Sequence, residues 1–423
     1  MRICLVSQEY PPGYVGGIGT QTHVKARGLL DQGHDVEVLT AGDQDMPTNQ
    51  PLATRIQDGV TVHALRPPGG SFALHSTEAY WLGYTWAVLG ALRSLAQARP
   101  FDVVDFPDYA AEGLAYQLDR PEQDGTTVVV HLHGSLGMFA SQIGWPPAHD
   151  PLLRIGMFME DSSVETADGL LAASRSLAEL TGARLEIDPA RIDVVAGAID
   201  SEFFTPASAR DRNGAAPRLL FVGNLVANKG VATVLEAFVR LSAAHPGLTL
   251  TIAGSDDGEV AEELRSRAAH AGLADRVSVL GFVEHAELPA LYRSADVFAA
   301  PSRYEGGLGL VYLEAMACGL PVVALAAGGA AEAIEHGETG LLMQGGDVEE
   351  TTAAIGTLLD DPALRARMGA AGAERVRANF TQARYAEKVT RAYERAIERR
   401  RRGRTTQSTS LAAAQHPLRE AAE

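Results

Sequence analysis

Residues 301–321, PSRYEGGLGLVYLEAMACGLP, describe the end of a strand, a glycine-rich turn and a helix in one run. A strand-like run at 296–300 leads into the turn, and Leu310, Leu313 and Met316 then follow helical spacing. A glycine and a proline end this helix in the usual order. Because glycines let bare backbone N–H groups approach a ligand at the positive end of a helix, the turn is suited to an anion.

Two carboxylates frame this turn. Glu305 precedes it, and Glu314 lies inside the helix that follows. Carboxylates accept hydrogen bonds from hydroxyl groups, while the amides of the turn attract an anion. The combination is suited to a sugar phosphate.

The same segment resembles the donor-site signature of glycosyltransferase family 4, a family of retaining enzymes with the GT-B fold. The resemblance implies that Glu305 meets the donor sugar and Glu314 the ribose. It also implies donor contacts from the residues of the turn and the helix start: Gly307, Leu308, Gly309 and Leu310. The family usually sets its two glutamates eight positions apart, but here they are nine apart, with the added residue in the turn. The length of the match favours this interpretation over an ordinary turn with two surface acids.

Length and composition limit the class of protein. At 423 residues the chain exceeds one typical core, so two domains and a tail are expected. A formal net charge of −17 argues against nucleic-acid binding and requires local positive groups at any site for an anionic donor. The two cysteines, Cys4 and Cys318, lie in apolar segments and suit a reducing cytoplasm.

No targeting or membrane-spanning segment is expected. The start of the chain indicates a first strand and not a signal peptide, because its apolar run soon ends in polar residues. The apolar run at 79–92 is too short to span a bilayer, so a buried or interfacial helix is expected there. These features predict a cytoplasmic protein.

Strand-like and helix-like segments alternate along the chain, as in parallel sheets with helices on both faces. We expect a Rossmann-like acceptor domain at 1–205 and a Rossmann-like donor domain at 206–380, joined by a polar linker at 207–217. Two doubly wound α/β sheets facing a central cleft bind ligands at the carboxyl ends of their strands. The resemblance implies this GT-B architecture. Strands are expected at 2–7, 35–40, 60–65, 102–106, 127–133, 169–173 and 192–195, and then at 218–222, 248–253, 277–280, 297–300 and 321–325.

A last helix is expected at 381–402, with one apolar stripe. The stripe consists of residues at steps of four: Tyr385, Val389, Tyr393 and Ile397. The resemblance implies that this helix crosses back to the N-terminal domain. The arginines at 399–402 are interpreted as a solvated helix end, with peripheral contact to anionic lipid as the alternative. Residues 403–423 are polar and alanine-rich and are expected to be disordered.

GNLVANKG at 223–230 follows the first strand of the second domain and resembles the family's G-R-L-x-x-x-K-G element. The resemblance implies that Lys229 holds the diphosphate, where a cation would stabilise the leaving group as its charge grows. The family's arginine position is Asn224, which can donate a hydrogen bond but carries no charge. Arg303 is a candidate for the missing charge. A solvated surface lysine is the alternative for Lys229.

Two further segments are expected to complete the donor site. The glycine-rich loop at 13–19 lacks the G-x-G-x-x-G spacing of a dinucleotide fingerprint. It resembles the family's GGIG loop, which implies that Gly16 and Gly17 lie against the donor phosphates. Residues 281–283 resemble the segment that meets the nucleotide base, which implies contacts from Phe282 and Val283. A core position is the alternative for Phe282.

Candidate metal ligands are few. His131 and His133 share a face at the end of a strand, but no third ligand follows at a suitable spacing. The resemblance implies that His133 faces the donor sugar as a catalytic residue, while a core histidine is the alternative. Asp43 and Asp45 have the D-x-D form of metal-dependent transferases of another fold, and are interpreted as a solvated turn. The resemblance implies that no divalent metal is needed when a lysine and amides hold the diphosphate, so no metal or other cofactor is expected.

The sequence predicts a metal-independent, retaining hexosyltransferase-type enzyme using a UDP- or GDP-sugar. The resemblance implies same-face substitution, in which the leaving phosphate oxygen helps to deprotonate the acceptor. A small molecule, a saccharide and a lipid remain open as acceptors, and the loops at 67–75 and 134–149 are expected to contact it. The alternatives are a GT-B epimerase or phosphorylase and a catalytically silent nucleotide-sugar binder. The segments at 328–332 and 336–342 are assigned mostly to folding of the second domain. The oligomeric state stays open.

Overall fold

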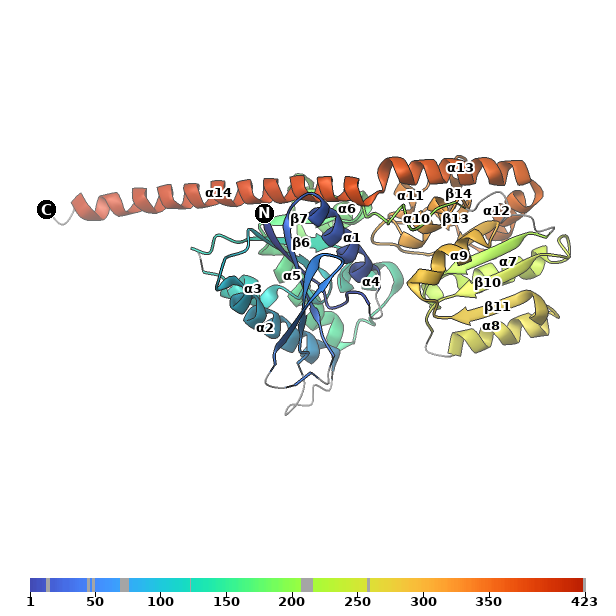
Figure 1. The fold of residues 1–423 in the computed structure, drawn as a ribbon, viewed down its shortest axis with the longest axis horizontal. Coiled ribbons are helices and arrows are strands. Elements are labelled where there is room, and N and C mark those ends of the chain that lie inside the picture. Colours follow the sequence, from blue (N-terminus) through green and yellow to red (C-terminus); the bar gives the residue numbers. More distant parts are fainter. Residues whose placement is uncertain are drawn as a thin grey trace.

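The computed structural model describes residues 1–12, 16–43, 46–47, 50–68, 76–121, 123–206, 216–256 and 259–420, with side chains described as far as residue 402. The chain forms two α/β lobes, each built on its own sheet (Figure 1). A long C-terminal helix leaves the second lobe and runs across the first. Several sequence predictions lie outside the described residues: positions 13–15 of the first glycine loop, Asp45, positions 69–75 and linker residues 207–215.

The first lobe contains an eight-stranded sheet in the order β3-β4-β2-β1-β5-β6-β7-β8. Its strands are β1 (Arg2–Val6), β2 (Asp35–Ala41), β3 (Leu52–Gln57), β4 (Val60–Leu65), β5 (Val103–Pro107), β6 (Thr127–Leu132), β7 (Gly169–Ala172) and β8 (Ile192–Val194). Its helices are α1 (Gly17–Asp31), α2 (Thr77–Ala96), α3 (Leu114–Asp119), α4 (Leu136–Ile143), α5 (Pro151–Glu165) and α6 (Arg175–Leu185). All strand pairs are parallel except β3–β4.

Strand β3 is the part of this sheet that the sequence did not predict. It forms a hairpin with β4 through Asp58 and Gly59, both of which have positive φ. The strand lies at the edge of the sheet, and none of its side chains is fully buried. An edge strand needs little apolar character, so its sequence carried no alternating signal.

The second lobe contains a six-stranded parallel sheet in the order β11-β10-β9-β12-β13-β14. Its strands are β9 (Arg218–Val222), β10 (Thr249–Ala253), β11 (Val277–Gly281), β12 (Val297–Ala300), β13 (Val322–Leu325) and β14 (Gly340–Met343). Its helices are α7 (Val231–Leu241), α8 (Glu259–His270), α9 (Leu288–Arg293), α10 (Leu310–Ala317), α11 (Ala330–Ala333), α12 (Val348–Asp360) and α13 (Pro362–Asn379). Strand β14 was not predicted; it lies at the edge of the sheet, and two of its four residues are only partly buried, so it is not a continuous buried run.

Strand order reverses once in each sheet, and these points position the site. β1 lies between β2 and β5, and β9 lies between β10 and β12. In each sheet, the connections from the two adjacent strands at this point (β1 and β5, or β9 and β12) run to opposite faces. A crevice therefore opens at the carboxyl ends of these strands. The loops after β1, β5, β9 and β12 therefore border the region where a ligand is expected.

The core of each lobe agrees with the apolar runs in the sequence. β5, β6 and β12 are buried along their whole length, as expected for strands covered on both faces. Cys4 and Cys318 are buried free thiols, as predicted. Burial raises the pKa of the Cys4 thiol far above its usual value, so this group stays protonated. No helix in the described residues combines the length and apolar character needed to cross a bilayer.

The C-terminal helix α14 (Gln382–Glu420) packs on the first lobe. Tyr385, Val389 and Tyr393 of the apolar stripe are buried against residues of β1, β2 and β5, and Ile397 is partly buried beside them. Figure 1 shows the helix lying along the top of that lobe and continuing past it. The helix includes residues 403–420, for which the sequence predicted disorder. Its alanines, glutamines and arginines are good helix formers, and they extend a helix that is already nucleated.

The arginines near residue 400 also correct a prediction. Arg399 lies 3.1 Å from Asp193, and Arg400 lies 2.7 Å from Asp168 and donates to the carbonyl of Asp124. Both acids belong to the first lobe, one just before β7 and one in β8. These two arginines therefore hold α14 against that lobe, where a solvated helix end had been expected.

Candidate functional site

Lys229 and Glu305 meet at the switch point of the second sheet. Lys229 ends the 3₁₀ helix η3 (Ala227–Lys229) after β9, and Glu305 follows β12. The Lys229 ammonium donates to Glu305 Oε1 at 2.6 Å, and the lysine and glutamate side chains are 28% and 14% exposed. These values argue against a freely solvated surface lysine. The cation and the acid singled out in the sequence thus form an ion pair.

The backbone of the lysine loop is held by its neighbours. Gly230 has φ +77°, and a Cβ there would lie 2.7 Å from the Pro301 carbonyl oxygen, so a side chain would not fit. The Arg303 backbone N–H donates to the Asn228 carbonyl at 2.8 Å, which joins the loop after β12 to the loop after β9. The side chains of Asn224 and Arg303 are exposed. A compensating role for Arg303 remains a prediction.

The turn at 306–309 places backbone groups at the start of α10. Gly309 has φ +73° and precedes the first helical residue, Leu310, while Leu308 is buried and anchors the turn. Behind the turn, the Gly329 N–H donates to the Glu305 carbonyl at 3.1 Å. A Cβ on Gly329 would lie 2.0 Å from the Gly307 carbonyl oxygen. The turn therefore rests on bare backbone and has one well-defined shape.

Glu314 has a different hydrogen-bond partner from the Lys229–Glu305 pair. It is 5% exposed, and its Oε2 accepts a hydrogen bond from the hydroxyl of Tyr292 at 2.8 Å. Burial raises the pKa of Glu314 from 4.5 to about 7, and the Tyr292 hydrogen bond lowers it in part. Glu314, the predicted ribose ligand, thus lies in the helix that follows the turn. The described hydrogen bonds do not connect it to Lys229 or Glu305.

His133 reaches the site from the first lobe, and its backbone is held by Asp108. The Asp108 carboxylate accepts from the N–H groups of His133 at 2.8 Å and Gly134 at 3.2 Å. Burial raises the pKa of Asp108 to about 6, although these backbone hydrogen bonds lower it. Burial and the Lys25 ammonium lower the pKa of His133 to about 3, so its imidazole is neutral at physiological pH.

Sequence reasoning missed several residues of the first lobe, and one of the second, that lie near His133. Glu160 is fully buried, and its carboxylate accepts from the N–H groups of Ala110 and Leu136, at 3.2 Å and 2.8 Å. Tyr304 reaches from the second lobe into an apolar cluster of the first and packs against Phe139, with ring centroids 5.7 Å apart. One signal could have identified Asp108, because an acid directly after a buried strand lies at the carboxyl edge of the sheet.

The remaining predicted donor residues follow the carboxyl ends of strands β1 and β11. Gly16 precedes α1, and its N–H donates to Glu9 Oε2 at 2.5 Å, while Gly17 is exposed as the first residue of the helix. Phe282 is 51% exposed, which excludes a core position for this ring. Val283 packs partly on the core of the second lobe.

The chain resembles proteins of known activity over nearly its whole length. The family described as "Glycosyl transferase 4-like domain" matches residues 16–198, and the family described as "Glycosyl transferases group 1" matches residues 207–375. The glycogen synthase of Mycobacterium tuberculosis is 34% identical over 395 residues, which cover 90% of this chain and 91% of that protein. This chain belongs to glycosyltransferase family 4.

Other relatives of this glycosyltransferase differ in their named activity. The D-inositol 3-phosphate glycosyltransferase of Stackebrandtia nassauensis is 32% identical, with 94% of this chain and 92% of that protein covered. A GDP-mannose-dependent phosphatidylinositol monomannoside mannosyltransferase of Mycolicibacterium smegmatis is 36% identical over 58% of this chain and 64% of that protein. The structure of a sucrose-phosphate synthase from Thermosynechococcus elongatus matches with a TM-score of 0.78 at 24% identity, covering 94% of this chain and 99% of that one. The predicted GT-B fold is confirmed.

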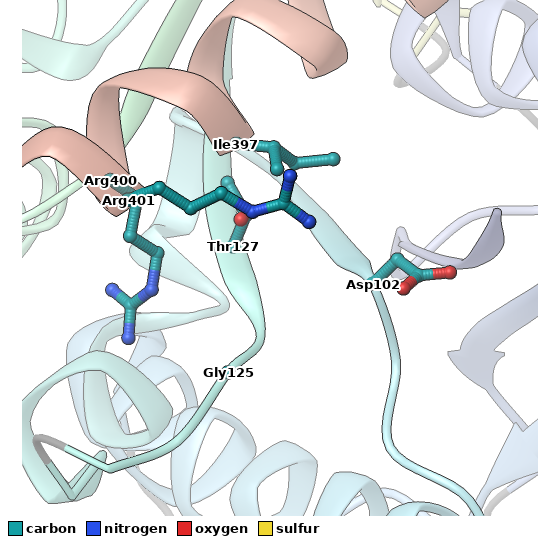
Figure 2. A pocket seen from close by; sticks show the side chains of 6 residues that line it. All are labelled: Asp102, Gly125, Thr127, Ile397, Arg400 and Arg401. Atoms are coloured by element: carbon teal, nitrogen blue, oxygen red, sulfur yellow. The ribbon is translucent and has the colours of Figure 1, made fainter.

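A cavity of about 240 Å³ lies elsewhere in the glycosyltransferase, between α14 and the starts of β5 and β6 (Figure 2). Its lining consists of Asp102, Gly125, Thr127, Ile397, Arg400 and Arg401. The starts of parallel strands lie at the edge of the sheet opposite to His133. The cavity is therefore separate from the candidate site. Within the described parts of the chain, no three His, Cys, Asp or Glu side chains are grouped so as to hold a metal ion.

Proposed function

We propose that this glycosyltransferase transfers a hexose from a nucleoside diphosphate sugar to an acceptor with retention of configuration. The observation that carries the proposal is the meeting of Lys229 and Glu305, 2.6 Å apart, at the switch point of the second sheet. A cation for a diphosphate and an acid for sugar hydroxyls are needed side by side in such a site. One of the relatives is named as GDP-mannose-dependent, which supports a nucleotide-linked donor.

Each predicted residue takes one role in this proposal. Lys229 and the amides at 307–310 neutralise the diphosphate, so that the site needs no divalent metal. Glu305 orients the donor sugar, and Glu314 accepts hydrogen bonds from the ribose. Asn224 donates a hydrogen bond where a second cation would otherwise lie. Neutral His133 lines the sugar from the first lobe.

The transfer step balances without a separate protein base. The bond between the anomeric carbon and the phosphate oxygen breaks, and the acceptor oxygen bonds to the same face of that carbon. The acceptor proton passes to the departing phosphate oxygen. Negative charge grows on the diphosphate during the step, and the preorganised Lys229 ammonium and turn amides would stabilise it.

Ligand binding and product analysis test the function. UDP, GDP and ADP are compared by thermal shift, and the sugar donor of the best binder is then incubated with saccharide, polyol and lipid acceptors. We expect one nucleotide to raise the melting temperature and one acceptor to receive the sugar with its anomeric configuration kept. An isomerised sugar would indicate an epimerase, a sugar phosphate a phosphorylase, and binding without turnover a silent binder.

The elevated pKa of Glu314 predicts a pH-dependent donor affinity. Only the ionised carboxylate accepts from both ribose hydroxyls, and the pKa near 7 leaves the group mostly protonated at lower pH. The affinity for the nucleoside diphosphate should therefore fall by up to about tenfold for each pH unit below about pH 7. Calorimetry at several pH values measures this slope. Glu314→Gln should bind more weakly and lose the Glu314 contribution to the slope. An identical pH profile in this variant would remove Glu314 from the ribose site.

The cellular location is part of the same proposal. Both cysteines are buried free thiols, and the absence of disulfides among them suits a reducing compartment. We therefore assign the enzyme to the cytoplasm.

A further inference from the structure

The second lobe contacts the start of α6 in the first lobe through three hydrogen bonds. The Glu332 carboxylate accepts from the backbone N–H groups of Arg175 at 3.0 Å and Ser176 at 2.9 Å. The hydroxyl of Ser174 donates to the Gly306 carbonyl at 2.6 Å. Figure 1 shows α6 and α11, the helix that contains Glu332, at the junction of the two lobes. This corrects the assignment of residues 328–332 mostly to folding of the second domain.

These contacts satisfy groups that a helix cannot satisfy by itself. The first N–H groups of α6 have no partner within the helix. Ser174 Oγ accepts from the N–H of Leu177, and Glu332 takes the two N–H groups before it. A carboxylate is also favoured at this positive end of the helix dipole. The first lobe therefore binds the Glu332 carboxylate with a defined geometry.

On the donor side, Glu332 is fixed to the turn that carries the donor amides. A Cβ on Gly328 would lie 2.3 Å from the Glu305 carbonyl oxygen, so α11 begins in direct backbone contact with that turn. From α13, the Arg375 guanidinium donates to the carbonyl groups of Glu332 at 2.9 Å and Ala333 at 2.7 Å. Glu332 therefore moves with the donor turn.

On the acceptor side, Ser174 is fixed to the loop that carries His133. It follows β7, and the N–H of Ala173 donates to the carbonyl of Leu132 at the end of β6. The donor turn approaches this loop closely, since a Cβ on Gly306 would lie 2.3 Å from the His133 carbonyl oxygen. A small relative shift of the lobes would therefore displace Glu305 from His133.

We propose that Glu332 and Ser174 are positioning residues of the transfer reaction. They fix the donor turn of one lobe against the His133 loop of the other, so that the donor sugar and the acceptor meet in a reactive arrangement. Neither residue touches the donor in this assignment. The inference rests on the proposed function for its kinetic consequence, whereas the contact itself can be tested independently of that function.

Hydrogen exchange and kinetics of Glu332→Ala test the inference. In the substrate-free enzyme, the amides of residues 175 and 176 should exchange about tenfold faster than in the wild type, because their acceptor is lost. The turnover of transfer should fall about 10- to 100-fold, the scale of a misplacement near 1 Å. The dissociation constant of the nucleoside diphosphate should change less than about twofold, because Glu332 makes no contact with the donor in this proposal.

Three further variants separate positioning from general damage. Glu338→Ala removes an exposed glutamate near the same helix and should match the wild type in all three measurements. Glu332→Gln keeps one acceptor oxygen and should recover part of the turnover, and it replaces the alanine variant if that variant does not fold. Ser174→Ala should lower turnover in the same direction without changing nucleotide affinity.

Each outcome has a distinct meaning. Unchanged exchange at residues 175 and 176 would show that the contact is absent, and faster exchange with unchanged turnover would show that it is only structural. Either result overturns the inference. If the wild-type enzyme binds no nucleoside diphosphate and transfers no sugar, the proposed function fails, and the exchange result still reports on the contact.

Discussion

Replacing Lys229 with alanine should lower the turnover of sugar transfer by roughly 100- to 1,000-fold, the usual effect of removing one preorganised charge contact. The ammonium lies 2.6 Å from Glu305, and this hydrogen bond holds it in place. Because charge on the leaving group grows in the transition state, the loss should affect kcat more than KM. Steady-state kinetics with the donor identified by thermal shift measures both constants.

The chain offers a matched control for this variant. Lys388 is exposed on α14, and Lys388→Ala removes the same charge and the same number of atoms. It should leave both kinetic constants unchanged. Lys229→Arg keeps the charge but changes its shape, and it should recover only part of the activity. Wild-type turnover in Lys229→Ala would show that the diphosphate is held elsewhere.

Replacing Asp105 with alanine should destabilise the first lobe by about 3–5 kcal/mol, because it leaves a buried ammonium without its counter-charge. Lys25 and Asp105 are each 3% exposed, and Lys25 Nζ lies 3.0 Å from Asp105 Oδ2. The same ammonium donates to His131 Nδ1 at 2.9 Å, and the hydroxyl of Tyr393 donates to Asp105. The loss would therefore also weaken the packing of α14 on the first lobe. Urea denaturation followed by the fluorescence of the first lobe measures the change.

Two comparisons identify the cause of this loss. Asp119→Ala removes an acid from the solvent-exposed pair with Arg93 and should cost no more than about 1 kcal/mol. The double variant Lys25→Met with Asp105→Leu removes both buried charges, and it should be more stable than Asp105→Ala alone. If Asp105→Ala costs as little as Asp119→Ala, the buried charges do not depend on each other.

The roles of His131 and His133 were predicted only in part from the sequence. The sequence showed that His131 and His133 share a face, offered no third metal ligand, and left a core position open as the alternative. The structure separates the two roles, because His131 accepts from Lys25 in a buried network, whereas the backbone of His133 is held by Asp108 beside the donor turn. Sequence spacing cannot show this, because Lys25 lies in α1 and Asp108 directly follows β5, both far from the histidines along the chain.

Local patterns in the sequence predicted most strands of the two sheets, and the resemblance to the family pointed to the central pair of the site. Buried parallel strands are continuous apolar runs, so β9 and β12 could be predicted, and Gly230 and Gly309 mark turns that have positive φ. The edge strands β3 and β14 are only partly buried and lacked such a pattern. Only the tertiary structure decided that Glu332 holds α6 of the other lobe, that Asp108 orients His133, and that Tyr393 completes the pair of Lys25 and Asp105. The physical reason is that these hydrogen bonds join residues as far as 288 positions apart, and a period or a spacing reports only on neighbours along the chain.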